Sequence, residues 1–115
     1  MYETGYGEEL NVSKARYWYE KAIENGHPKA ICRLGITYYE DEDDPESTEK
    51  AFYWLKRSAE IPDAEGCYYL GLCYIEGIGT EKSLEMAIKY LTRSKELGYA
   101  AAESAIATVW YQNSN

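Results

Sequence analysis

Apolar residues recur along this chain at helical spacing, and the same arrangement returns in successive segments. Between about Ser13 and Asn25 they follow the i, i+3, i+4, i+7, i+8 spacing of an amphipathic helix: Ala15, Trp18, Tyr19, Ala22 and Ile23. A second apolar stripe comes after Pro28, a residue that suits the first turn of a helix: Ala30, Ile31, Leu34 and Tyr38. The pattern predicts two helices that pack as an antiparallel pair.

This helical pattern has a period of 36 residues. The interval is kept by four columns of packing residues: Tyr2, Tyr38, Tyr74 and Trp110; Ala15, Ala51 and Ala87; Trp18, Trp54 and Tyr90; Leu34, Leu70 and Ile106. A repeated unit of this size buries its remaining apolar face on the next unit. We therefore predict an all-α fold, a right-handed solenoid of antiparallel helix pairs spanning residues 1–115. Its periods are about 2–37, 38–73 and 74–109, and the last helix runs to about residue 112.

Small residues predict where helices end and where they cross. Gly26, Pro62 and Gly98 lie one period apart, where the second helix of each pair should stop. Gly35 and Gly71 lie in mid-helix, where glycine costs about 1 kcal/mol relative to alanine. Their recurrence indicates that another helix crosses closely at these two positions.

Several segments carry a family resemblance. Residues 14–22, 50–55, 70–80 and 86–90 read KARYWYEKA, KAFYWL, LGLCYIEGIGT and MAIKY. They resemble the Sel1-like repeat, whose pattern is LGxxYxxGxG followed by KAxxWYxKA. The resemblance implies a tetratricopeptide-like scaffold that binds other proteins and has no catalytic role. The second repeat departs from the pattern because Asp41 and Asp43 replace the loop glycines, so that turn should take another path.

The two ends of the chain are expected to be unusual. Residues 2–7 match the end of a helix and its loop, and the segment from about Ala100 to Gln112 is apolar on most sides. Solenoid ends normally carry a polar outer face. Two explanations stay open: the chain is a piece of a longer repeat array, or its uncapped terminal helices are covered by self-association or by a partner.

Charge and cysteine content narrow the possible partners and the compartment. The chain has 20 acidic and 12 basic residues, a formal net charge of −8, so binding to nucleic acid is not expected. No apolar run approaches the roughly 18 residues of a membrane span, so no membrane association is expected. The chain has an odd number of cysteines, Cys32, Cys67 and Cys73, and their spacing favours free thiols. The cysteine spacing that forms disulfides in some extracellular Sel1-like relatives is absent. These features favour a cytoplasmic protein.

Most of the net negative charge comes from one segment, residues 40–49, which holds seven acidic and no basic residues; without it the chain has 13 acidic and 12 basic residues. A calcium loop that begins at Asp41 fails because Pro45 takes the fifth position and Glu46 takes the place of the required glycine. Two interpretations remain: a solvated loop with acids near a helix N-terminus, or a docking site for a basic partner. The residues of this predicted acidic loop are Asp41, Glu42, Asp43, Asp44 and Glu46.

Catalytic and metal-binding patterns are not found. His27 is the single histidine, and the cysteines form neither a CxxC pair nor a Cys/His cluster, so neither a nucleophile–base pair with a second histidine nor a zinc site is supported. No glycine-rich phosphate loop is present. We therefore expect no enzyme activity, no cofactor and no metal.

The first helix of each pair should line the concave surface of the solenoid. Four columns on these helices are expected to lie outside the core: Lys29, Glu65 and Ala101; Arg33, Tyr69 and Ala105; Thr37, Cys73 and Val109; Glu40, Glu76 and Gln112. Exposed tyrosine beside arginine is typical of binding hot spots. The candidate partner-binding residues are Arg33, Tyr39, Glu40, Tyr69, Glu76 and Tyr111.

Two functions fit this sequence. One is a protein–protein interaction scaffold or adaptor that binds its partner through the concave helix surface. The alternative is a small acidic intracellular inhibitor or immunity-type protein that neutralises a basic toxin or enzyme, attracted by the local charge.

Overall fold

A computed structural model describes the backbone of residues 5–41, 44–61 and 63–113, and side chains from residue 12 to residue 111 within these ranges. Its elements are α1 (Gly5–Glu24), α2 (Lys29–Tyr39), α3 (Pro45–Glu60), α4 (Ala64–Glu76), α5 (Leu84–Glu96) and α6 (Ala101–Asn113). Three helices begin at side chains that accept backbone N–H groups, namely Asp44, Asp63 and Ser83. These ranges contain helices and no strand, so the predicted all-α class is confirmed.

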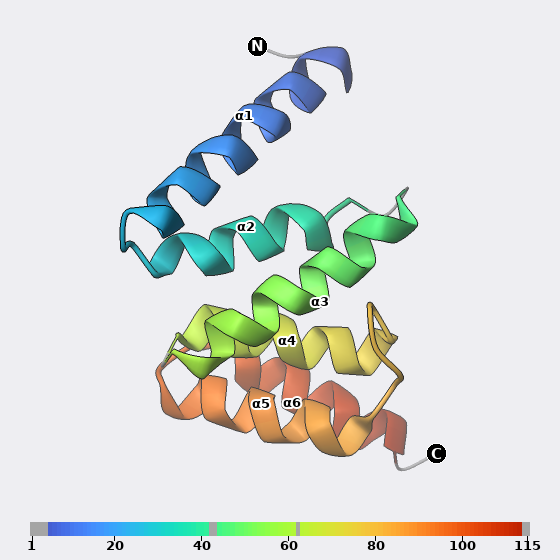
Figure 1. Cartoon of the computed structure of the whole chain (residues 1–115). Helices are drawn as coiled ribbons and strands as arrows, with labels where there is room; N and C mark the ends of the chain where they lie inside the picture. The colour runs from blue at the N-terminus through green and yellow to red at the C-terminus, as the bar shows by residue number, and fades with distance from the viewer. Residues whose placement is uncertain (1–4, 42–43, 62, 114–115) are drawn as a thin grey trace.

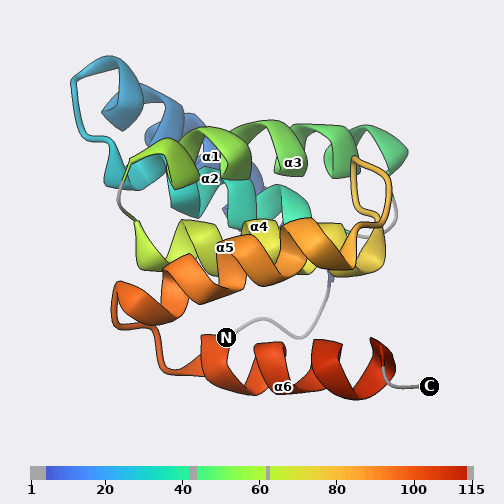
Figure 2. The ribbon, with the colours of Figure 1, turned by 90° about the horizontal axis from the view of Figure 1, so that it is seen from below.

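The helices stack in chain order, each one packed on the next (Figure 1). In addition, α2 contacts α4 and α4 contacts α6, whereas the described parts of α1, α3 and α5 make no such contacts with one another. In a curved stack, the row whose members touch lies on the inner side. We therefore call α2, α4 and α6 the inner row and α1, α3 and α5 the outer row. Figure 2 shows the successive layers from α3 to α6.

The core is built from equivalent residues of successive repeats. Leu34 and Leu70 of the inner row and Leu55 and Leu91 of the outer row are fully buried. Gly35 lies against Leu55 and Gly71 against Leu91; a Cβ atom added to Gly71 would be 2.7 Å from Leu91 Cγ. The predicted close helix crossings at the mid-helix glycines are therefore confirmed.

The connection from α4 to α5 depends on two loop glycines. Gly77 and Gly79 have φ angles of 75° and 72°, which disfavour residues with a Cβ atom. Gly79 also packs directly on Thr48 and Phe52 of α3. In the connection from α2 to α3, Asp41 takes the place of Gly77 and does not have a positive φ, so the turn takes a different path there, as predicted. Asp43, which takes the place of Gly79, lies outside the described residues.

The start of the chain differs from expectation. Gly5 and Gly7, predicted to lie in a loop, belong to α1, which begins eight residues before the expected Ser13. The later loop is held by its packing on a preceding helix; among the described residues no helix precedes α1, so this segment continues the helix. Residues 2–4 of the predicted loop lie outside the described part of the chain.

Trp18 also departs from its column. Its side chain is 64% exposed, whereas Trp54, one period later, is half-buried. The reason is the number of neighbours: α3 packs on both α2 and α4, whereas the described part of α1 packs on α2 alone.

Candidate functional site

The inner row presents two parallel stripes of polar and aromatic residues. On α2 the stripe contains Lys29 and Arg33 and ends at the cap residue Glu40. On α4 the equivalent residues are Glu65, Tyr69 and Glu76. Each stripe spans 11 residues, close to three helical turns, so its members lie on one side of their helix.

Contacts between α2 and α4 place these stripes side by side. At the N-terminal ends, Arg33 Nη2 lies 3.3 Å from Glu65 Oε1. At the C-terminal ends, the Tyr39 hydroxyl donates a hydrogen bond of 3.1 Å to Glu76 Oε1. Of the predicted partner-binding residues, Tyr39 therefore contacts Glu76 directly, whereas Arg33 pairs with Glu65, which was predicted to lie outside the core but not as a partner-binding residue.

An aromatic row crosses the same face. Tyr39 contacts Tyr69 edge-to-face with ring centroids 5.3 Å apart, Tyr69 contacts Tyr68, and Tyr68 contacts Tyr99 at 4.8 Å. Burial, together with the carboxylate of Glu76, raises the pKa of Tyr39. Burial also raises the pKa of Tyr69. These phenols therefore stay protonated at neutral pH and act as hydrogen-bond donors with an apolar ring.

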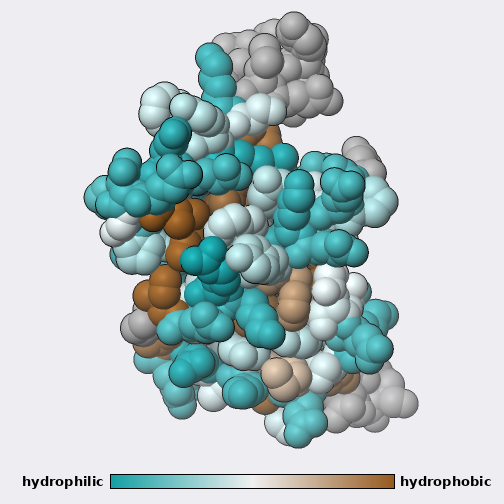
Figure 3. Space-filling view, in the orientation of Figure 1, coloured by the Kyte–Doolittle hydropathy of each residue, from teal (hydrophilic) through white to brown (hydrophobic). Residues whose placement is uncertain are grey.

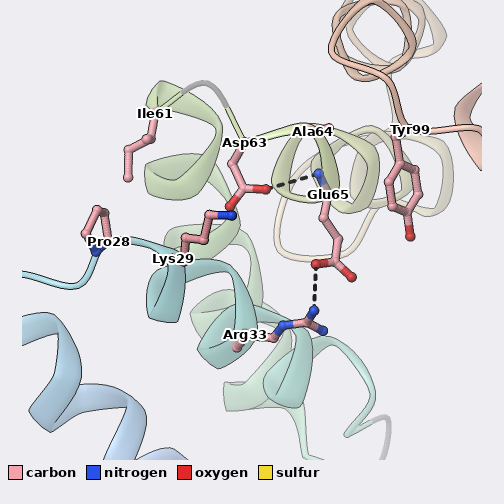
Figure 4. Close-up of a pocket in the computed structure, with 8 residues that line it drawn as sticks. All are labelled: Pro28, Lys29, Arg33, Ile61, Asp63, Ala64, Glu65 and Tyr99. Atoms are coloured by element: carbon pink, nitrogen blue, oxygen red, sulfur yellow. Dashed lines mark hydrogen bonds and ion pairs between the residues drawn. The ribbon is translucent and has the colours of Figure 1, made fainter.

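A pocket of about 420 Å³ opens where α2 and α4 begin (Figure 4). Arg33 and Glu65 face each other across it, and Asp63 accepts the backbone N–H groups of Glu65 and Gly66. On the face drawn in Figure 3, hydrophobic surface gathers on the side where α2 and α4 begin. The pocket is lined by Pro28, Lys29, Arg33, Ile61, Asp63, Ala64, Glu65 and Tyr99.

Sequence reasoning missed this pocket. Asp63 and Tyr99 are one period apart and lie just before α4 and α6; Pro28 and Ala64 are also one period apart and lie at the starts of α2 and α4. The 36-residue spacing of residues at the connections between helices could therefore have indicated this pocket, in addition to the spacing within helices. The pattern of helix-packing residues gave these positions no role in binding.

Two of the columns predicted to lie outside the core are partly or wholly buried, and the prediction is wrong there. Cys73 is 0% exposed, Val109 1% and Ala105 9%. Because α4 packs on α3 and α5 and also on α2 and α6, its buried surface is wider than a single stripe. Thr37 is half-buried, and its hydroxyl and carbonyl oxygens accept hydrogen bonds from Arg16 of α1.

The remaining partner-binding candidates are exposed. Glu40 lies at the C-terminal end of α2. Tyr111 of α6 is 75% exposed. Its equivalent Tyr39 packs on α4, and the described chain places no further inner-row helix beside α6.

The acidic loop is partly engaged in internal contacts. Asp44 caps α3 by accepting the N–H of Glu46, which lies in the first helical turn. Asp41 accepts a hydrogen bond of 3.1 Å from the Ser47 hydroxyl and lies 3.7 Å from Arg16. These contacts match the interpretation of acids near a helix N-terminus. Glu42 and Asp43 lie outside the described residues.

The cysteines and the single histidine are not arranged in a reactive or metal-binding cluster within the described residues. Cys32, Cys67 and Cys73 are free and buried, and burial raises the pKa of Cys32 and Cys73 to about 12. The side chain of His27 lies exposed between α1 and α2. Within the described ranges, no group of His, Cys, Asp and Glu side chains is placed to hold a metal ion. In the same ranges, no helix is long and apolar enough to cross a membrane.

Comparison with solved structures finds the same fold. The chain is similar to the protective antigen c5321 of uropathogenic Escherichia coli strains, which displays an SLR fold, at 26% identity and a TM-score of 0.80, over 88% of this chain and 21% of that one. It is also similar to a Sel1 repeat protein from Oxalobacter formigenes, at 31% identity and a TM-score of 0.71, over 85% of this chain and 40% of that one. The chain thus spans less than half of either protein. No curated protein matches it significantly.

The sequence matches the Sel1 repeat over residues 1–27, 28–62 and 64–99. The second match covers α2 and α3 and the third covers α4 and α5, so each contains one helix pair. Sel1 repeats generally form non-catalytic scaffolds that commonly mediate protein–protein interactions. With these matches across most of its length and the helical stack described above, the chain belongs to the Sel1 repeat family and forms an α-solenoid.

Proposed function

We propose that this chain is a scaffold or adaptor that binds a partner protein through the inner row of helices. The observation that carries the proposal is the half-exposed surface formed by Arg33, Tyr39, Tyr69 and Glu76, whose side chains are held by contacts between α2 and α4. Side chains that are already positioned lose little conformational entropy when a partner docks.

The charge of this surface favours a basic partner. The inner row and its capping residues carry two basic and five acidic residues, namely Lys29 and Arg33 against Glu40, Asp63, Glu65, Glu76 and Glu103. Complementary charge of this kind speeds association and discriminates between partners. A cytoplasmic location belongs to the same proposal and is supported by the three free, buried cysteines.

Quantitative affinity capture from native lysate tests the proposal. Arg33→Glu and Tyr69→Ser alter the inner row, and Tyr53→Ser is the matched control because Tyr53 is 54% exposed on the outer helix α3. We expect both inner-row variants to lose partners that the wild type and the control retain, with unchanged circular dichroism spectra. Retention of every partner by both inner-row variants would contradict the proposal.

The same experiment separates the alternative function. A single stoichiometric basic partner, released by added salt, would favour the small inhibitor or immunity-type protein. Several partners would favour the adaptor.

A further inference from the structure

We use the name groove for the two stripes on α2 and α4 together with the pocket at their N-terminal ends. We propose that this groove binds an extended peptide segment in which an apolar residue and a lysine or arginine are about five residues apart. The apolar side chain enters the pocket at the start of the two helices, and the basic side chain lies between Glu40 and Glu76 at their ends. This inference rests on the proposed function, since it requires the inner row to be the binding surface.

The pocket end of the groove selects by shape. Pro28, Ile61, Ala64 and Tyr99 supply apolar or aromatic walls. The charges around it are balanced, because two basic residues, Lys29 and Arg33, face two acidic residues, Asp63 and Glu65. The volume of about 420 Å³ is within the range of about 300–1,000 Å³ that ligand pockets occupy. Burial in this pocket stabilises an apolar side chain. A charged side chain of either sign gains no net attraction there, because it meets both basic and acidic residues.

The pairing of charges at this end supports the same conclusion. Arg33 is already engaged with Glu65 at 3.3 Å, and Glu65 also accepts a weak hydrogen bond of 3.9 Å from the Cys32 thiol. Asp63 is occupied by the two backbone N–H groups that it caps. Three charged residues of the pocket, Arg33, Asp63 and Glu65, therefore already have polar partners within the chain.

The opposite end of the groove has an excess of negative charge. Glu40 and Glu76 are both exposed, and they lie where α2 and α4 end, at the negative ends of two helix dipoles. Among the described residues, no lysine or arginine lies within ion-pair distance of either glutamate; Arg16, which donates to Thr37 near the end of α2, is paired with Asp41. A cation from a partner would find here two carboxylates and the ring of Tyr39.

The distance between the two ends sets the spacing of the peptide. Lys29 and Glu40 are 11 residues apart on one helix, which is about 16 Å at 1.5 Å per residue. An extended chain advances about 3.3 Å per residue, so about five residues cover this distance. Tyr69 and Tyr39 lie between the ends and offer rings for the intervening side chains to contact.

Titration of isotope-labelled protein with synthetic peptides, followed by amide chemical shifts, tests the inference. The probes are serine-rich peptides with one leucine and one arginine two, five or eight positions apart, together with a peptide in which glutamate replaces arginine. We expect the tightest binding at five positions, with shifts along α2 and α4, and the weakest binding for the glutamate peptide.

Matched variants identify the contribution of the acidic end. Glu40→Gln combined with Glu76→Gln keeps a hydrogen-bond acceptor for Tyr39 and removes both charges. We expect it to weaken the arginine peptide about two- to tenfold, as exposed ion pairs do, and to flatten its salt dependence. Glu49→Gln combined with Glu85→Gln changes two exposed outer-row glutamates and should leave the affinity unchanged.

The outcomes separate the inference from the function on which it rests. If peptides shift α2 and α4 but arginine, glutamate and spacing make no difference, the bipartite peptide is refuted and the inner-row binding surface stands. If no peptide shifts the inner row, or if the shifts lie on α3 and α5, the peptide proposal is refuted, and affinity capture with Arg33→Glu and Tyr69→Ser decides separately on the inner-row surface.

Discussion

Replacing Gly71 with alanine tests the close crossing of α4 and α5. The new Cβ atom would lie 2.7 Å from Leu91 Cγ and 2.8 Å from Leu91 Cδ2, closer than real Cβ contacts allow. Overpacking of this kind costs about 1–3 kcal/mol, and the gain in helix propensity offsets about 1 kcal/mol. We therefore expect a net loss in unfolding free energy of about 0–2 kcal/mol.

Truncation of the facing side chain supplies the second arm of a double-mutant cycle. Leu91 is fully buried, so Leu91→Ala should cost about 2–5 kcal/mol through lost transfer energy and the cavity that it leaves. In the double variant the new methyl group occupies part of that cavity and no longer meets the leucine. The loss in the double variant should then be smaller than the summed single losses by about 1–2 kcal/mol.

Urea denaturation followed by circular dichroism and tryptophan fluorescence measures all four free energies. The matched control pairs Gly71→Ala with Leu55→Ala, because Leu55 packs on Gly35 and not on Gly71. These two losses should add. Additive losses for the Gly71 and Leu91 pair, or equal coupling in the control, would refute the crossing geometry as the reason for glycine at this position.

Three further predictions concern other parts of the molecule. Arg16 lies 4.0 Å from the centre of the Tyr38 ring and donates hydrogen bonds to the end of α2. We therefore expect Arg16→Met to speed amide hydrogen exchange in α1 and to leave exchange in α5 unchanged; exchange in α1 as slow as in the wild type would contradict this. Burial holds the pKa of Cys73 at about 12, against an ordinary value of 9.0, so the folded chain keeps protons that the unfolded chain releases. The urea midpoint should therefore fall as pH rises from about 9 toward 12, and less steeply in Cys73→Ala; a midpoint that rises over this range would refute the sign. Because Trp18 is 64% exposed on α1, we expect light scattering at rising concentration to give a mass above 13.2 kDa, which Trp18→Ser should lower; a constant monomer mass in the wild type would refute self-association through this face.

Much of the candidate site could be predicted from sequence because it lies on helices with a fixed period. Residues 36 apart occupy equivalent places in successive repeats, so placing Arg33 on one inner-row helix also placed Tyr69 on the next. The contacts of Arg33 with Glu65 and of Tyr39 with Glu76 join neighbouring positions of these two helices, 32 and 37 residues apart. The 36-residue period therefore predicted both the fold and the side of the inner-row helices on which the candidate residues lie.

Periodicity failed where the number of neighbours changes from one repeat to the next. Trp18 and Trp54 occupy the same column, yet one is 64% exposed and the other half-buried, because α1 has one packing partner in the described chain and α3 has two. Cys73 and Val109 were placed on the surface by their column and are buried. Cys73 lies on α4, which contacts α3 and α5 and also α2 and α6, and Val109 lies on α6, which packs on both α5 and α4.

The sequence by itself determined the helices, their pairing and the repeat, because propensity, capping and apolar spacing act over a few neighbouring residues and recur at one interval. Tertiary structure alone decided the pocket of about 420 Å³, since its walls come from α2, α4 and three separate connections that meet only when successive repeats stack. Tertiary structure also decided which acidic residues are available to a partner. Asp41 contacts Arg16 and Ser47, whereas Glu40, its neighbour in sequence, is exposed beside the groove. Such differences depend on which side chains from other helices come close, and local spacing carries no information about that.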